Sequence, residues 1–277
     1  MRPIVKRRTA FFVSDRTGIT AETLGLSLIS QFEETHFTQV TLPFVDSEEK
    51  ALEASSRINQ AFKTDGDRPL VFATIIKPDI KAILSKTHAF YIDYFDTFIG
   101  QLENELKSSS SKEIGRIHGM GNGNIYNSRI EAVNFALNYD DGAKINNYEA
   151  ADIILIGVSR SGKTPTCLYL AMRYGILAAN YPITEDDLDN MGLPKFLVPH
   201  KSKIFGLTIS AERLQAIRQG RRPNSRYATL TQCNREVRTV EKLFKQENIP
   251  HLSSTSVSIE ELAAKILVIS GIERKIS

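Results

Sequence analysis

The chain has 277 residues, of which 42% are hydrophobic and 24% are charged, and its net charge is +3. This composition is typical of a globular protein, and the length allows two domains or one large α/β domain. The near balance of 35 basic and 32 acidic residues argues against a general nucleic-acid or membrane binder. Two cysteines argue against a disulfide framework and suit a reducing compartment, so we expect a cytoplasmic protein.

The N-terminus is basic but carries no long apolar run. The stretch from residue 10 to 13 is broken at once by Ser14 and Asp15, so we expect no signal peptide. No other apolar run approaches the length of a membrane span, and we therefore expect neither a membrane nor a nucleic acid as partner.

Apolar runs alternate with helical periodicity through the first half of the chain. Strands are predicted at residues 10–13, 40–45 and 70–76. Helices are predicted at 21–32 and 47–64, with another opened by Pro78 and a helical stretch over 89–107. Leu24, Leu28 and Phe32 share one apolar face of the first helix. This alternation favours a parallel sheet with crossover helices.

A polar loop, residues 14–20, separates the first strand from the first helix. Its side chains Ser14, Asp15, Thr17 and Thr20 fit an anion pocket and fit helix capping equally well. Four serines at 108–111 then lead into a glycine-rich stretch, which has the composition of a linker or mobile loop.

The second half repeats the α/β pattern. A helix is predicted at 128–138, strands at 153–156 and 203–208, a helix ending near Tyr174, and a long polar helical region over 211–246. Ser258 and Glu261 form a capping box for a last helix. We therefore predict an N-terminal α/β domain, residues 1–145, followed by a phosphate-loop-containing, kinase-like α/β domain, residues 146–277.

The segment from 157 to 164 matches G-x-x-x-x-G-K-[ST] at every fixed position. Glycines let the backbone wrap closely around phosphate oxygens, and successive N–H groups form an anion nest at a helix N-terminus. Lys163 offers a positive charge to the terminal phosphate, and Thr164 offers a hydroxyl to Mg²⁺. The predicted phosphate-binding residues are Gly157, Val158, Ser159, Arg160, Ser161, Gly162, Lys163 and Thr164.

Several signatures of common phosphate-loop enzymes are missing. The strand at 203–208 has no terminal Asp to help hold Mg²⁺, and the chain has no N-K-x-D, H-R-D or D-F-G motif. The loop therefore indicates an unusual phosphotransferase.

Weaker candidates each have a plainer alternative. Asp140 and Asp141 suit a turn before Gly142, but they also suit a Mg²⁺ ligand or a catalytic base. His118 is either a surface residue or a catalytic one in the glycine-rich stretch. The acidic residues Asp186, Asp187 and Asp189 favour a solvated loop over a metal site.

An arginine series runs through the helical region after residue 211. Most such runs are solvated faces, although some members could meet phosphates or an acidic surface, Arg226 foremost. The series comprises Arg213, Arg218, Arg221, Arg222, Arg226, Arg235 and Arg238.

Eight segments spread across nearly the whole chain carry a resemblance to one family: SDRTGITAE at 14–22, TLPFV at 41–45, RPLVF at 68–72, YDDG at 139–142, GVSRSGKTPT at 157–166, ANYP at 179–182, NSRYA at 224–228 and SIEE at 258–261. In these segments, which occur in family order, the chain resembles the bifunctional regulatory proteins of phosphoenolpyruvate synthase and of pyruvate, phosphate dikinase. Gly162 before Lys163 looks like the synthase branch, with the dikinase branch as the alternative.

The resemblance implies two opposed reactions on a target threonine. ADP donates a phosphoryl group and inactivates the synthase; inorganic phosphate removes that group, releases pyrophosphate and restores activity. It implies ADP and inorganic phosphate as ligands. Together with the motif and the weaker candidates above, this makes Lys163, Asp141 and His118 the catalytic candidates and Thr164 the candidate ligand of Mg²⁺. A small-molecule kinase and a non-catalytic nucleotide sensor are the alternatives, and a homodimer is one option for the assembly.

Overall fold

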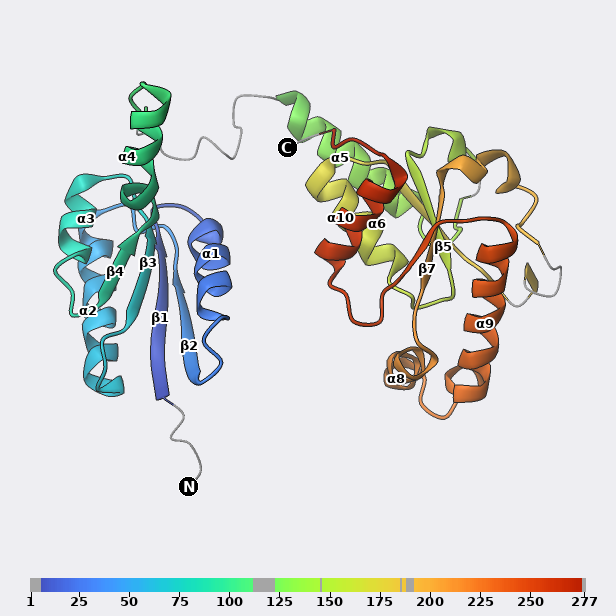
Figure 1. Ribbon diagram of the computed structural model, residues 1–277, viewed down its shortest axis with the longest axis horizontal. Coiled ribbons are helices and arrows are strands. Elements are labelled where there is room, and N and C mark those ends of the chain that lie inside the picture. The colour runs from blue at the N-terminus through green and yellow to red at the C-terminus, as the bar shows by residue number, and fades with distance from the viewer. Residues whose placement is uncertain (1–5, 112–122, 145, 185, 188–191, 276–277) are drawn as a thin grey trace. The chain divides into compact units, whose positions relative to one another are not determined.

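The computed structural model describes residues 6–111, 123–144, 146–184, 186–187 and 192–275. The chain divides into two compact units, residues 1–120 and 121–277, and each contains its own four-stranded sheet (Figure 1). The predicted α/β class, with two successive α/β domains, is confirmed. No described helix combines the length and the apolarity that a membrane span requires.

The first unit is a parallel sheet between two layers of helices. The strand order is β2-β1-β3-β4. Its elements are β1 (Lys6–Ser14), α1 (Ile19–Ile29), β2 (Thr35–Leu42), α2 (Glu48–Asp65), β3 (Leu70–Thr74), α3 (Pro78–Leu84), β4 (Phe90–Asp93) and α4 (Tyr94–Leu106).

Alternate residues of β1 supply the two cores of this unit. Phe11 and Val13 pack with residues of α2 and α3, including Ile58 and Ile80. Phe12 points to the opposite face and packs with α1 and with Tyr94 at the start of α4. The period of two in a strand explains why one apolar run serves both layers.

The apolar side chains of Leu24, Leu28 and Phe32 are exposed, and Gly25 of α1 faces the core, where a Cβ would lie 2.4 Å from the Phe12 ring. One prediction for this unit is wrong. The stretch at 89–107, predicted as helical, begins with strand β4. Its aromatic and β-branched residues favour a strand, and pairing with β3 decides the matter.

The polar loop after β1 does not cap α1 with a side chain. The N-cap residue is Gly18, in the left-handed conformation, and it makes no side-chain capping hydrogen bond. Ser14 Oγ instead accepts hydrogen bonds from the Arg16 N–H and from Thr74 Oγ1, and the Asp15 carboxylate accepts one from the Ile76 N–H. These contacts tie the end of β1 to the end of β3.

The second unit has the strand order β6-β5-β7-β8, which is the order of the first unit when the strands of each unit are counted along the chain. All of its strand pairs are parallel as well. Its elements are α5 (Gly123–Asn138), η2 (Tyr148–Ala150), β5 (Ile153–Gly157), α6 (Lys163–Tyr174), β6 (Ala178–Pro182), η3 (Val198–Lys203), β7 (Ile204–Thr208), α8 (Ala211–Arg221), η4 (Arg226–Ala228), α9 (Leu230–Gln246), β8 (His251–Ser253) and α10 (Ile259–Ser270).

Helices cover both faces of this sheet as well (Figure 1). Ile153 and Leu155 pack with residues of α5, α6 and α10. Ile154 and Ile156 point the other way and pack with residues of α8 and α9. Strand β5 is thus buried along its whole length, and the loop that follows it starts from a rigid base.

The boundaries in this unit differ from the prediction at several points. Helix α5 packs on α6, so it belongs to the second unit. The boundary along the sequence therefore lies between residues 120 and 121, whereas the prediction put it between residues 145 and 146. The helical region predicted at 211–246 is broken into α8, η4 and α9 around Pro223 and Asn224, whose φ is 57°. The short strands β6 and β8 were not predicted, because runs of three to five residues carry little periodicity.

Candidate functional site

The phosphate loop, residues 157–164, joins β5 to α6 with a backbone that needs its glycines. A Cβ at position 157 would lie 2.1 Å from the Leu207 backbone oxygen, so only glycine fits. Gly162 has a φ of 92° and directly precedes α6. Arg160 also has a positive φ, 76°, a conformation that costs a non-glycine residue about 1 kcal/mol and that its surroundings must hold.

Hydrogen bonds from outside the loop hold three of its carbonyl groups. Gly157 O accepts from the Ile183 N–H at 3.0 Å, Ser159 O from Arg218 Nη2 at 3.2 Å, and Ser161 O from Ser254 Oγ at 2.8 Å. In a trans peptide the C=O and the next N–H point in opposite directions. Each carbonyl held by the surrounding protein therefore turns the following N–H toward the interior of the loop, which is the arrangement of an anion nest.

Lys163 occupies that interior before any anion arrives. Its side chain is 3% exposed, and Nζ donates a hydrogen bond to Val158 O at 3.0 Å. Burial lowers its pKa to about 8, although the negative charges of Asp141 and Asp140 partly offset the effect. A buried ammonium with so few partners is prepared to bind an anion and is costly to keep without one.

This cost predicts that Lys163→Met stabilises the unliganded protein. A fall in pKa from 10.5 to about 8 corresponds to on the order of 3 kcal/mol against the folded state at pH 7. Because the folded pKa lies below the unfolded one, wild-type stability rises with pH between about 8 and 10.5. We expect Lys163→Met to raise the free energy of unfolding by about 1–3 kcal/mol at pH 7, with a gain that shrinks over this window.

Urea unfolding from pH 6 to pH 10 measures this gain. Lys265→Met is the matched control, because Lys265 lies exposed on α10 and should change stability by no more than about 0.5 kcal/mol. A Lys163→Met protein that is less stable than wild type at pH 7 would show that the ammonium is well satisfied in the folded chain.

Thr164 is paired with a carboxylate from outside the loop. Its Oγ1 donates to Asp140 Oδ1 at 2.7 Å, and Asn180 Nδ2 donates to the same oxygen at 2.7 Å. Asp140 follows α5 and Asn180 lies on β6, so the packing of α5 and β6 about α6 creates the pair. Asp140 thus lies where other phosphate-loop enzymes place an Asp from a later strand.

The turn that carries Asp140 is fixed to β6. The Asp141 N–H donates to Asn180 Oδ1 at 3.1 Å, and the Asn180 N–H donates to Tyr139 O at 3.0 Å. Asp141 and Gly142 both have a positive φ, and a Cβ on Gly142 would lie 2.8 Å from the Tyr181 ring. The turn expected from the sequence is therefore present, and it lies beside the loop; a role for its carboxylates as Mg²⁺ ligand or catalytic base stays a prediction.

Thr164 and Asp140 form a donor set that fits Mg²⁺. Mg²⁺ takes oxygen ligands and is commonly held by one or two protein groups together with substrate phosphates and water. No cluster of three or more His, Cys, Asp or Glu side chains with a metal-binding arrangement occurs among the described residues. A hydroxyl and one carboxylate would therefore hold Mg²⁺ only together with the phosphates of a ligand.

The other predicted site residues fare differently. Asp141 is exposed near Lys163, and its charge acts on that ammonium. His118 and Asp189 lie outside the described residues. Asp187 accepts hydrogen bonds from Tyr181 Oη and from the backbone and hydroxyl of Thr184, so it orders a turn.

A pocket of about 480 Å³ opens beside the loop, and Ser159 and Arg226 are among its lining residues. Arg226, the arginine singled out in the sequence, therefore lines a pocket beside the loop. Contact between Arg226 and a ligand stays a prediction. Arg218, from the same arginine series, is fully buried behind the loop.

Residues outside the motif support the loop: Asn180, Arg218, Tyr227 and Ser254 all bond to it or to Asp140. The sequence pointed to Arg218 only as one of a series of arginines, and it assigned no such role to the other three. A weak signal existed for Asn180, a polar residue inside an apolar strand, and for Tyr227, which lies in one of the segments of resemblance.

Comparison with known proteins finds relatives along nearly the whole chain. A sequence model described as kinase/pyrophosphorylase matches residues 10–267. A protein of Marinobacter nauticus that bears the name of a phosphoenolpyruvate synthase regulatory protein is 55% identical over 268 residues, covering 97% of this chain and 99% of the relative. Proteins of the same name from Pseudomonas fluorescens and Legionella pneumophila are 56% and 55% identical, covering 97% and 98% of this chain and 99% and 100% of the relatives.

Proposed function

Because this chain belongs to the kinase/pyrophosphorylase family, we propose that its phosphate loop catalyses two opposed phosphoryl transfers on a threonine of phosphoenolpyruvate synthase. The names of the relatives support the target. The observation that supports the chemistry most strongly is the buried Lys163 inside a loop, three of whose carbonyls accept hydrogen bonds from outside it, beside the Thr164–Asp140 pair. This is a site for adjacent phosphates next to a cation ligand set.

The two reactions exchange the same bond. In phosphorylation the threonine Oγ attacks the β-phosphorus of ADP, the bond to the bridging oxygen breaks, and AMP leaves with that electron pair. In the opposed reaction an oxygen of inorganic phosphate attacks the phosphothreonine phosphorus, and the bond between that phosphorus and the threonine Oγ breaks. The two phosphates leave together as pyrophosphate, and the threonine hydroxyl is restored. Inorganic phosphate then lies where the α-phosphate of ADP lies, so one pocket serves both directions.

The residues of the site divide the work. Lys163 and the loop N–H groups stabilise the charge on the transferred phosphoryl group. Thr164 and Asp140 would hold Mg²⁺, which neutralises phosphate charge when bound. Asp141, exposed at the edge of the loop, is the described candidate for taking the threonine proton in one direction and returning it in the other. His118 is the second candidate for that role.

Lys163→Ala should abolish both activities and leave a folded protein. A charge-assisted contact to the transferred group contributes about 2–4 kcal/mol in the transition state, or about 30- to 1000-fold in rate. Rates of threonine phosphorylation with ADP, and of pyrophosphate release from the phosphorylated synthase, test this, with Lys265→Ala as the control. Near-normal rates in both directions would place the active site elsewhere.

Asp140→Asn should raise the Mg²⁺ concentration that gives half-maximal activity by about tenfold or more, because the variant keeps the shape of the side chain and loses its charge. Asp187→Asn is the control, since that carboxylate serves a turn in the same unit. Titrations of both variants with MgCl₂ measure the shift. An unchanged requirement for Mg²⁺ would remove Asp140 from the metal site.

Charge reversal at the end of α8 should weaken recognition of the protein substrate. Arg221 and Arg222 are exposed there, near the pocket that Arg226 lines. Attraction between such charges and an acidic partner surface weakens as salt rises. We expect Arg221→Glu with Arg222→Glu to raise KM for the synthase several-fold and to leave ADP affinity unchanged.

A salt series on synthase phosphorylation, with ADP titrations of the same variants, makes this measurement. Lys265→Glu controls for the change in net charge. A loss of ADP affinity with synthase recognition intact would assign these arginines to the nucleotide instead.

A further inference from the structure

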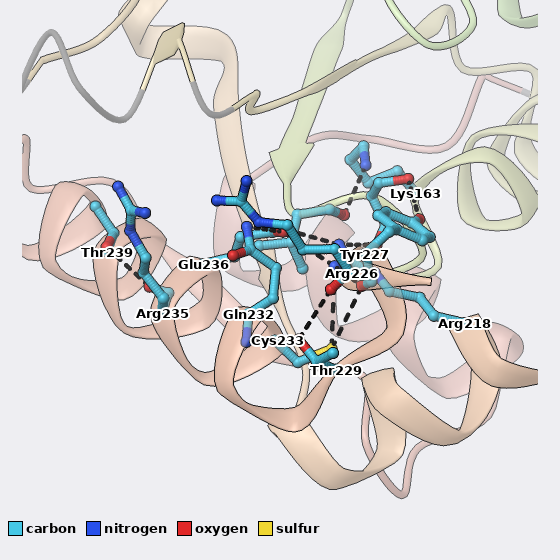
Figure 2. A network of polar contacts seen from close by, with 12 residues as sticks. Lys163, Arg218, Arg226, Tyr227, Thr229, Gln232, Cys233, Arg235, Glu236 and Thr239 are labelled. Atoms are coloured by element: carbon cyan, nitrogen blue, oxygen red, sulfur yellow. Dashed lines mark hydrogen bonds and ion pairs between the residues drawn. The ribbon is translucent and has the colours of Figure 1, made fainter. Parts of the chain in front are cut away.

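A buried ion pair lies next to the phosphate loop, where both of its residues also line the pocket beside Ser159. Arg218 on α8 is 0% exposed, and Glu236 on α9 is 9% exposed. Arg218 Nη1 and Nη2 donate to Glu236 Oε1 and Oε2 at 3.0 and 2.6 Å, and Gln232 Nε2 donates to Oε1 at 2.9 Å (Figure 2). The carboxylate therefore fixes the plane of the guanidinium through two parallel hydrogen bonds.

Stability alone does not account for this pair. Two charges taken out of water lose their hydration, and replacing a buried ion pair by apolar side chains of similar volume is often neutral or stabilising. Arg218 Nε has no hydrogen-bond partner within the part of the chain that the structure describes. We therefore look for the role of the pair in the contacts that Arg218 makes with residues other than Glu236.

The pair reaches the loop at Ser159. Arg218 Nη2 donates to Ser159 O at 3.2 Å, and Nη1 donates to Tyr227 O at 3.0 Å. The guanidinium also lies 3.9 Å from the centre of the Tyr227 ring, and Tyr227 Oη donates to Ser159 Oγ at 3.0 Å. Ser159 is thus held at its backbone carbonyl and at its hydroxyl by two side chains that also contact each other.

Ser159 directly precedes Arg160, the non-glycine residue of the loop that has a strained, left-handed backbone. Arg160 has a positive φ, and its N–H belongs to the same rigid peptide group as the Ser159 carbonyl. Holding that carbonyl outward fixes the direction of the Arg160 N–H and offsets the cost of the left-handed conformation.

We propose that Arg218 and Tyr227 are positioning residues that hold Ser159 so that the Arg160 N–H faces a bound phosphate, and that Glu236 serves to orient Arg218. The proposal rests on the proposed function for the identity of the substrate, but the contacts concern the loop itself. An anion should bind a preorganised loop more tightly, because fixed dipoles need no reorganisation when it arrives.

The test replaces the pair by apolar side chains of similar volume, Arg218→Met with Glu236→Leu. Urea unfolding reports global stability, hydrogen exchange reports the amides of residues 158–164, and calorimetry with inorganic pyrophosphate reports anion binding. We expect global stability at or above that of wild type, loop exchange faster by about tenfold or more, and pyrophosphate affinity lower by about tenfold or more. The exposed ion pair Lys201–Glu247, replaced in the same way by Met and Leu, is the control and should leave exchange and affinity unchanged.

A second pair of variants keeps the test decisive if the first does not fold. Tyr227→Phe and Ser159→Ala remove the same hydrogen bond from its two ends, and both leave the Arg218–Glu236 pair in place. Each should accelerate exchange of the Arg160 amide, and the double variant should add nothing to either single one.

Wild-type exchange and affinity in a folded Arg218→Met, Glu236→Leu protein would overturn the proposal, and so would fully additive effects of Tyr227→Phe and Ser159→Ala. Hydrogen exchange needs neither a nucleotide nor a protein substrate. A failure to phosphorylate the synthase would therefore count against the proposed function and leave this result standing.

Discussion

The orientation of the peptide groups between Gly157 and Gly162 is the constraint on which the site depends. A loop can present N–H groups to an anion only if its carbonyls point away and find donors elsewhere. The donors come from widely separated parts of the chain: the residue after β6, helix α8, and the serine after β8. In the parallel sheet β6-β5-β7-β8, the strands β6 and β8 end at the same edge of the sheet as β5, and the loop follows β5 at that edge. Helix α8 follows β7, which ends there too.

The cost of this arrangement is visible in the unliganded chain. Lys163 is buried with a lowered pKa, Arg160 has a left-handed backbone, and Arg218 and Glu236 are buried as charges. The buried Lys163 charge and the left-handed Arg160 backbone oppose folding, and both become favourable or useful once an anion lies in the loop. When free energy is spent on arranging these groups during folding, the site needs little rearrangement when the anion binds. Such preorganisation is the property that phosphoryl transfer requires most. The first unit shares the strand order but carries no such loop after β1, where Ser14 and Asp15 bond to the end of β3 and the residue beyond it.

The parts of this account that the sequence predicts are local. The motif at 157–164 is recognisable because its chemistry lies in consecutive residues, and the helix predicted to end near Tyr174 does end there, followed by Gly175 with a φ of 68°. The pairing of Asp140 with Thr164 spans 24 residues and that of Arg218 with Ser159 spans 59, so no spacing rule could reveal them. Periodicity does not show which face of α1 is buried for a related reason: close packing on Phe12 requires Gly25, and periodicity counts large side chains rather than small ones. Strand β4 was missed because its four residues take their conformation from pairing with β3.

The central claim is that this one loop moves a phosphoryl group between ADP and a threonine of the target enzyme. The most direct measurement is incubation of the protein with purified phosphoenolpyruvate synthase and ADP labelled at the β-phosphorus, followed by mass spectrometry and recovery of the label from the synthase. The account predicts label on a threonine, formation of AMP, and release of the label as pyrophosphate when inorganic phosphate is added. Transfer from the γ-phosphate of ATP in place of ADP, or an unlabelled synthase in the presence of protein that binds ADP, would contradict it.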